Sequence, residues 1–299
     1  MKKVFIIGCG LLGSSLVRGI SKKKLAKKIF IYEKSKLNIT KIKSLRLPVT
    51  IVKSLKDGVA NSDLIIFCTP MSEYKRLILK INNFVSPKTI ITDIGSVKIK
   101  SSKIIKKFLK KGIDWTQSHP IAGSEVSGPE HGKDNMFVDK WCVLIKDQKT
   151  NLKHLRFLNS FWRKVGSKIV IMNSEKHDQI FSITSHLPHL IAYNLVKSAK
   201  DYEKKIKFDL IKYSAGGLRD FSRIAASNEI MWRDIFFDNS QNISKAIDIF
   251  VKNLRDFKKD IRLKKNKSMI SKLTKAKKVR SQIIKLKQDI NKPDFGRSN

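Results

Sequence analysis

A glycine-rich turn near the start of the chain constrains the fold more than any other feature of the sequence. An apolar run over residues 4–7 leads into a turn with glycine at its first, third and sixth positions, and apolar residues at helical spacing follow. Gly8 permits a tight turn, Gly10 lets the backbone approach a pyrophosphate, and Gly13 lets the helix pack against the strand. The start of the helix offers unpaired N–H groups to phosphates. The pattern predicts a dinucleotide site formed by Gly8, Gly10, Leu11, Leu12 and Gly13, and a glycine turn without a ligand is the alternative.

An acidic residue at the end of the next strand predicts which dinucleotide binds. Glu33 follows the apolar run 29–32 and lies twenty positions after Gly13. Its carboxylate would accept hydrogen bonds from the adenosine ribose and repel a 2′-phosphate, which favours NAD. Because the cationic Lys34 stands beside it, NADP is not excluded. Thr69 and Pro70 follow another short apolar run and are expected to line the cofactor crevice.

The order of strand-like and helix-like segments predicts two domains. Short apolar runs at 64–67, 89–91 and 142–145 alternate with helical stretches, as in an α/β protein with a Rossmann-type, doubly wound parallel sheet. From about residue 172 strand-like runs largely vanish and helical spacing takes over. We therefore expect a dinucleotide-binding domain over 1–172, an all-helical substrate and dimerisation domain over 173–288, and a frayed basic tail over 289–299.

An apolar stripe marks a long helix in the second domain. Its members recur in steps of four and three residues, the spacing of a helix that packs against another helix or subunit. A second, basic helix is expected over 264–287. The stripe favours a homodimer formed through the helical domain, and it consists of Ile243, Ile247, Phe250, Leu254, Phe257 and Ile261.

The formal net charge of +38 suggests an anionic partner, but its composition weakens that interpretation. The chain has 51 lysines and 12 arginines, spread over its whole length beside abundant Ile and Asn, as a genome rich in A and T would encode. A nucleic-acid-binding protein that uses the basic helix 264–287 is one alternative function. Neither a nucleic-acid motif nor interleaved aromatic residues occur in that helix, so no specific nucleic-acid partner is expected.

Apolar runs and cysteines indicate the compartment. No apolar run reaches the roughly 18 to 20 residues of a membrane helix, so no membrane partner is expected. Three cysteines without a C-x-x-C spacing indicate neither a disulfide framework nor zinc, and fit a reducing cytoplasm. His186 and His189 lie three residues apart, with Pro188 expected to kink or end the local helix. They lack a third ligand at a recognisable spacing, and no metal is expected.

Several further motifs give the chain a family resemblance from the glycine turn to about residue 240. They are DIGSVK (93–98), SHPIAGSE (118–125), SHLPH (185–189), GGLRDFSRIA (216–225) and MWRD (231–234). With these segments in this order, the chain resembles the prephenate/arogenate dehydrogenase family. The resemblance implies NAD-linked oxidative decarboxylation of a cyclohexadienyl substrate in tyrosine biosynthesis. Prephenate would yield 4-hydroxyphenylpyruvate and arogenate would yield tyrosine, and the sequence leaves this choice open.

The resemblance implies catalytic roles for two residues. Oxidation of a ring carbinol needs a base for the hydroxyl proton, and a neutral imidazole near pH 7 suits that role. His119 is the candidate base, and Ser96, matched to the family's serine, would orient the same hydroxyl. Another NAD-dependent dehydrogenase of the β-hydroxyacid type is an alternative enzyme. That type uses a catalytic lysine in the helical half and does not require the HPIAG segment.

A substrate with two carboxylates needs a cationic anchor, and the resemblance places Arg223 in that role. Asp220 lies three residues earlier and would hold the guanidinium on the same helix face. Glu125 would join this ionic network, and His189 would contact the substrate or the polar network of the cleft. Trp232 is expected to be a core anchor. The remaining histidines match no motif and are expected at the surface or at helix caps: His131, His154 and His177.

Overall fold

The computed structural model describes residues 1–286 and 288, and the predicted tail over 289–299 lies outside them. The protein chain divides into two compact units, Met1–Ile243 and a smaller unit that begins at Ser244. Among the described residues, no helix is both long enough and apolar enough to span a membrane.

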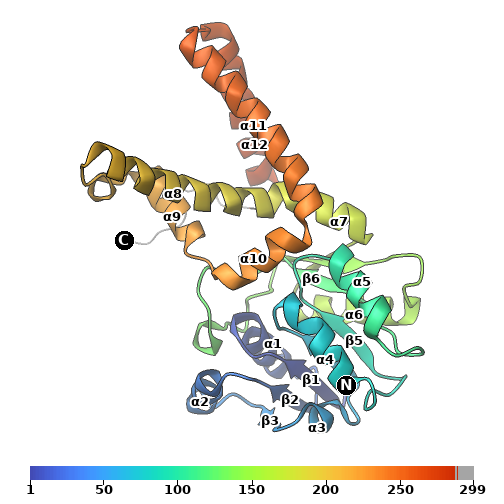
Figure 1. The fold of residues 1–299 in the computed structure, drawn as a ribbon. Coiled ribbons are helices and arrows are strands. Elements are labelled where there is room, and N and C mark those ends of the chain that lie inside the picture. The colour runs from blue at the N-terminus through green and yellow to red at the C-terminus, as the bar shows by residue number, and fades with distance from the viewer. Residues whose placement is uncertain (287, 289–299) are drawn as a thin grey trace. The chain divides into compact units, whose positions relative to one another are not determined.

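A five-stranded parallel sheet is the centre of the first unit (Figure 1). Its strands are β1 (Lys3–Ile7), β2 (Lys28–Tyr32), β3 (Thr50–Ile51), β4 (Leu64–Phe67) and β5 (Ile90–Asp93). The spatial order is β3-β2-β1-β4-β5, so the direction of winding reverses between β1 and β4. This arrangement confirms the predicted Rossmann-type sheet. The two-residue strand β3 was not predicted, because it is so short and begins just after Pro48.

Helices cover both faces of this sheet, which explains its uninterrupted apolar strands. Along β1 the even-numbered Val4 and Ile6 pack on one side, while Phe5 and Ile7 pack on the other. The first face is covered by α1 (Leu11–Lys22), α2 (Lys36–Ser44) and α6 (Leu152–Val165). The opposite face is covered by α3 (Leu55–Val59), α4 (Tyr74–Ile81) and α5 (Ile99–Phe108).

A smaller three-stranded sheet adjoins the end of β5. Its strands are β6 (Ser118–Pro120), β7 (Trp141–Ile145) and β8 (Lys168–Met172), with β6 antiparallel and β8 parallel to β7. The Ser118 hydroxyl donates to the Asp93 carbonyl at 2.6 Å and so joins β6 to β5. Only β7 was predicted. β6 is short and contains proline, and the apolar run of β8 lies at the predicted domain boundary.

Helices continue the first unit beyond the last strand. They are α7 (Ser174–Phe181), a π-helical segment (Ser182–His186), α8 (Leu187–Ile206), α9 (Gly216–Ala225) and α10 (Glu229–Asp238). Pro188 is the second residue of α8 and directly follows the π-helical segment, so the helical run does not end at this proline. Short 3₁₀ turns occur at Met71–Glu73, Pro129–His131 and Ile211–Tyr213. Trp232 and Ile235 of α10 join the apolar cluster on the α4–α5 face.

The second unit is a helical hairpin. Helix α11 (Ser240–Arg262) begins in the first unit, and α12 (Asn266–Lys285) follows after a short turn, which confirms both predicted helices. Asp260 accepts hydrogen bonds from the Ser268 hydroxyl and from the Lys272 ammonium, and that ammonium also lies over the ring of Phe257. These contacts hold the two helices together near their turn.

Candidate active site

The glycine turn has the geometry that each of its glycines was expected to provide. Gly8 has a φ of +90°, and a Cβ there would lie 2.7 Å from the Cys68 carbonyl oxygen. A Cβ on Gly13 would overlap the Gly8 carbonyl oxygen. At Gly10, which begins α1, a Cβ would meet no atom within 4 Å. Gly8 and Gly13 therefore need glycine for the fold itself, while Gly10 borders open space.

Glu33 holds the glycine turn from the end of β2. Its carboxylate accepts the backbone N–H of Cys9 at 2.8 Å and that of Ser35 at 2.9 Å. The neighbouring Lys34 points its ammonium to within 4.0 Å of the Glu73 carboxylate. Each carboxylate oxygen of Glu33 can still accept a further hydrogen bond.

Two more sequence-predicted residues follow β4 beside this turn. The Thr69 hydroxyl oxygen is buried and has no hydrogen-bond partner among the described residues, and Pro70 after it is exposed. An unpartnered buried hydroxyl is costly and indicates a missing ligand or water. Open space at Gly10 and the hydroxyl at Thr69 lie on either side of the point where the strand order reverses. This is where α/β sheets bind dinucleotides, and the residues fit such a group.

The segment that follows β6 lies along the glycine turn. A Cβ on Gly123 would reach 4.0 Å from the Leu12 side chain. Further along, the Ser14 hydroxyl donates to the Pro129 carbonyl at 3.2 Å, and the backbone N–H of Lys133 donates to Ser15 at 3.0 Å. The chain between Gly123 and Lys133 thus lies next to the predicted cofactor site.

His119 lies on β6 with only 9% of its surface exposed. Its Nδ1 lies 2.8 Å from Nε2 of His177, and its ring contacts Phe181 at a centroid distance of 5.0 Å. Burial, followed by the neighbouring His177 and the Lys98 ammonium, holds the pKa of His119 well below its usual range. The imidazole is therefore neutral at pH 7, as a general base must be before it accepts a proton.

His177 corrects a prediction, because we expected it at the surface or at a helix cap. It is fully buried in α7, and its Nδ1 lies 2.7 Å from a carboxylate oxygen of Asp178. Burial and the nearby Lys98 lower the pKa of His177 to about 2. No sequence motif identifies this residue. Its partner His119 is 58 residues away, and only the tertiary structure brings the two together.

Lys98 is a fully buried ammonium that joins the ends of two strands. It donates to the Asp93 carboxylate and to the Ser118 carbonyl, each at 2.7 Å. Tyr74 donates to the same Asp93 oxygen at 3.1 Å. A buried charge needs such partners, so these contacts set the shape of the turn after β5. Ser96 lies in that turn, half-buried.

Arg223 on α9 reaches the segment that contains His119. Its guanidinium lies 3.4 Å from the Glu125 carboxylate, and just over half of its side chain is exposed. Asp220 lies one turn earlier on the same helix and is partly buried. The structure thus brings Arg223 to Glu125, six residues after His119, as the predicted ionic network requires.

His189 and Trp232 form a stacked pair at the start of α8. His189 donates from Nδ1 to the Ser185 carbonyl at 2.9 Å, and burial lowers its pKa. Trp232 is buried as expected. His186 lies in the preceding π-helical segment, with its ring centroid 6.2 Å from that of the same indole. Burial lowers the pKa of His186 to about 4. Among the described residues, no group of three or more potential ligands could hold a metal ion.

A glycine turn lies at the reversal of a parallel sheet, and the segment that passes it begins at a buried neutral imidazole. These features define a dinucleotide-dependent dehydrogenase. Comparison with known proteins identifies the family. Residues 16–171 match the model of the prephenate dehydrogenase nucleotide-binding domain, and residues 173–275 match that of the prephenate dehydrogenase dimerization domain. The chain belongs to the prephenate dehydrogenase family, which confirms the family and the fold class predicted from the sequence.

Individual relatives agree with this assignment. Cyclohexadienyl dehydrogenase of Zymomonas mobilis is 33% identical over 254 residues, which cover 85% of this chain and 86% of that protein. Prephenate dehydrogenase of Bacillus subtilis is 28% identical over 253 residues, covering 84% and 68%. The crystal structure of prephenate dehydrogenase from Aquifex aeolicus with hydroxyphenyl propionate and NAD+ has a TM-score of 0.88 at 33% identity, covering 95% of this chain and 98% of that one.

Proposed function

We propose that this protein catalyses the NAD-dependent oxidative decarboxylation of prephenate to 4-hydroxyphenylpyruvate, a step of tyrosine biosynthesis. The observation that carries the proposal is the environment of His119. This imidazole is buried and neutral, and the segment that follows it runs from the glycine turn to the Glu125–Arg223 pair. A base, a cofactor site and a cation for carboxylates therefore meet around one segment of the chain.

The cofactor would be held at the carboxyl ends of β1, β2 and β4. Open space at Gly10 and the unpartnered Thr69 hydroxyl support this placement. When bound, NAD supplies the acceptor for the hydride that leaves the ring carbinol. The carboxylate of Glu33 would bind the adenosine ribose, and this favours NAD over NADP. The full proposed set is Gly8, Gly10, Leu11, Leu12, Gly13, Glu33, Thr69 and Pro70.

For the chemistry, we propose that His119 accepts the proton of the ring hydroxyl. Ser96 lies in the turn after β5 and would hydrogen-bond the same hydroxyl, which orients it toward the imidazole. Loss of the ring carboxylate as carbon dioxide then makes the ring aromatic. Because aromatisation drives the reaction, the protein chiefly has to align the substrate and stabilise charge.

For substrate binding, we propose that Arg223 anchors a carboxylate through its planar guanidinium. The Glu125 carboxylate lies 3.4 Å from that guanidinium. Asp220 adds a second acidic group on α9, the helix that also carries Arg223. His189 would contact the substrate with Nε2, because its Nδ1 already donates to the Ser185 carbonyl.

Arogenate is a second candidate substrate, and the relative named cyclohexadienyl dehydrogenase, at 33% identity, favours it. Prephenate and arogenate differ only in a side-chain keto or amino group. The deciding experiment measures initial rates with each substrate, in the presence of NAD or NADP. We expect the highest kcat/KM for prephenate with NAD. Turnover of neither substrate would refute the proposed function, and a preference for arogenate would select the second candidate.

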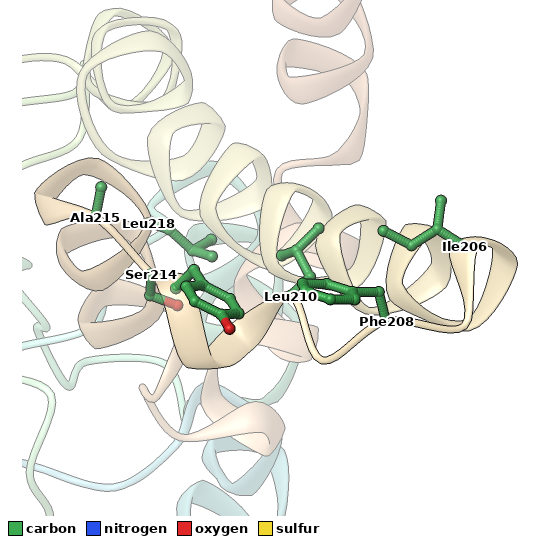
Figure 2. A pocket seen from close by; sticks show the side chains of 7 residues that line it. Ile206, Phe208, Leu210, Ser214, Ala215 and Leu218 are labelled. Carbon is green, nitrogen blue, oxygen red and sulfur yellow. The ribbon is translucent and has the colours of Figure 1, made fainter.

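We also propose a homodimer formed through the helical domain. Around the end of α8, apolar side chains border an open hollow of about 350 Å³ that nothing in the described chain fills (Figure 2). The second unit carries exposed apolar residues along the predicted stripe, with Leu254 and Ile261 more than half exposed. Residues 173–275 match the model of a dimerization domain, which supports a second copy of this chain as the partner. The hollow is lined by Ile206, Phe208, Leu210, Tyr213, Ser214, Ala215 and Leu218.

Sedimentation velocity tests the dimer. We expect a dimer at micromolar concentration, and a shift toward monomer for Phe208→Asp, because a charge in an apolar interface is costly. Monomer alone in the unmodified protein would contradict the proposal.

We propose in addition that the domain boundary falls at residue 172, and that the protein is cytoplasmic. The last described strand ends at Met172 and only helices follow, which supports a helical domain over 173–288. The compact division at Ile243 cuts the chain elsewhere, because α10 packs on the five-stranded sheet's helices and Phe181 of α7 packs on β7. Free Cys9, Cys68 and Cys142 suit a reducing compartment.

A further inference from the structure

Three buried side chains form a continuous hydrogen-bonded chain behind the candidate base. His119 Nδ1 lies 2.8 Å from His177 Nε2, and His177 Nδ1 lies 2.7 Å from Asp178 Oδ1. Each imidazole can donate from either nitrogen, so the two distances alone leave the direction of these bonds undecided. The surroundings of Asp178 decide it.

Asp178, at the end of this hydrogen-bonded chain, accepts hydrogen bonds from the backbone. Its Oδ1 accepts the backbone N–H of Lys98 at 2.8 Å, and its Oδ2 accepts that of Ile99 at 2.9 Å. These N–H groups belong to the start of α5, whose partial positive charge stabilises a carboxylate. Burial raises the pKa of Asp178, while the two backbone N–H groups and the Lys98 ammonium oppose that rise by stabilising the charged form. We therefore take Asp178 as the anion in this chain. His177 must therefore donate to it from Nδ1.

The remaining directions follow from the single N–H of a neutral imidazole. His177 is fully buried and neutral, so once Nδ1 carries the proton, Nε2 is an acceptor. His119 must then donate to it from Nδ1. Since His119 is neutral as well, its lone pair lies on Nε2, which has no hydrogen-bond partner among the described residues.

We propose that His177 and Asp178 are positioning residues, which hold His119 in the Nδ1–H tautomer and thereby make Nε2 the basic nitrogen of the active site. This inference rests on the proposed function, in which His119 receives the proton of the ring hydroxyl. In that step the O–H bond breaks and an Nε2–H bond forms. The new imidazolium still donates from Nδ1 to His177, which donates to the carboxylate.

The charges around the pair explain why such a chain is needed. Lys98 and His186 are the groups whose positive charge would oppose protonation of both His119 and His177. Asp178 is the carboxylate that is hydrogen-bonded to His177, and through His177 it stabilises the imidazolium that forms on His119 in the reaction. The ionisable groups that face the three residues from the surrounding elements are Lys98, with its partner Asp93, His186 and Asp238. Lys100 acts in turn on Asp238.

The tautomer can be observed directly in the NAD-bound enzyme by ¹⁵N NMR of labelled histidine, with the His119 signals assigned from their loss in His119→Asn. We expect the Nδ1–H form in the unmodified protein. His177→Phe keeps a buried ring but removes the acceptor, so His119 should sample both tautomers. By analogy with other oriented imidazoles, kcat should fall about 10²-fold or more, with KM changed little. His177→Gln offers an amide oxygen to Nδ1–H and should recover part of the rate.

A matched control is His154→Phe, which removes a partly buried histidine of α6 and should change neither kcat nor the His119 signals. Asp178→Asn tests the other end of the chain and should shift the acidic limb of the kcat/KM profile together with the tautomer. An Nε2–H form of His119 in the unmodified protein would overturn the proposal. So would variants that melt earlier but keep the tautomer and the pH profile, since Asp178 would then only cap α5.

These readings separate the inference from the proposed function. The tautomer is measured without substrate, so an enzyme that turns over neither prephenate nor arogenate would refute the function and leave the tautomer result intact.

Discussion

The imidazole of His189 lies face to face with the indole of Trp232, with ring centroids 3.7 Å apart and planes inclined by 21°. The two rings come from α8 and α10, and the same imidazole is held at its edge by a hydrogen bond from Nδ1 to the Ser185 carbonyl. Stacking and one hydrogen bond together leave the ring a single orientation. Trp232 thus supports a residue that we propose contacts the substrate.

Replacing this indole should affect substrate binding. An aromatic pair is worth about 0.5 to 1.5 kcal/mol beyond burial, so Trp232→Leu should raise KM for prephenate roughly 3- to 10-fold. Trp232→Phe keeps a stacking ring and serves as the matched control, with a nearly unchanged KM. Steady-state kinetics of both variants provides the check, and equal effects of Leu and Phe would refute the orienting role.

For His119→Asn we expect kcat to fall by a factor on the order of 10² to 10⁴, the usual contribution of a general base. Substrate binding should stay largely intact because Arg223 is unchanged. Turnover and product-analogue binding measured on the same preparation separate the two effects. A rate near that of the unmodified enzyme would remove His119 from the role of base.

Arg223→Lys should chiefly weaken substrate binding, because the ammonium lacks the planar pair of donors that a carboxylate accepts. Its contact with Glu125 is more than half exposed on the arginine side, so melting temperature should barely change. We expect KM to rise about tenfold or more while kcat changes less. An unchanged KM would contradict the anchoring role.

Two glycines of the turn should respond differently to alanine. A Cβ at Gly10 meets no atom within 4 Å, so Gly10→Ala should leave the melting temperature unchanged while weakening NAD binding at least about tenfold. A Cβ at Gly13 overlaps the Gly8 carbonyl, so Gly13→Ala should lower the melting temperature as well. Calorimetric titration with NAD and thermal melts test both. Unaltered NAD affinity in Gly10→Ala would move the cofactor away from this turn.

Stability should fall in mild acid. The pKa values of His177 and His186 are lowered to about 2 and about 4, from 6.5, chiefly by burial. At a pH between the folded pKa of each histidine and the unfolded value of 6.5, the unfolded chain binds more protons than the folded one. The stability that the two histidines contribute is therefore present above pH 6.5 and declines below it. The unfolding free energy should drop by up to about 1.4 kcal/mol per pH unit for each histidine.

Urea melts between pH 7 and pH 5 measure this slope. His177→Gln should make it shallower, whereas His131→Gln, at an exposed position, should not. A slope that is the same in all three proteins would show that His177 does not titrate on unfolding in this range.

Much of the fold could be predicted because its signals are local. The apolar run before Gly8, the glycine spacing and the helical periodicity after it specify a strand, a turn and a helix within about twenty residues. The long helix α11 was predicted for the same reason, since its apolar stripe repeats along one element. In contrast, β6 was missed because a three-residue strand with proline carries almost no pattern. β8 was missed although its sequence KIVIM is an apolar run, because this run lies at the boundary where helical spacing takes over.

The sequence by itself determined the dinucleotide fold and, through matched motifs, the family and the identity of His119 and Arg223 as candidate site residues. Only the tertiary structure decided what surrounds them. His177 looks like a surface residue in the sequence, yet it is buried against His119, 58 positions away. Periodicity and motif spacing report which face of an element is apolar. They do not report which distant side chains share a hydrogen bond, and those partners decide which nitrogen of an imidazole carries the proton.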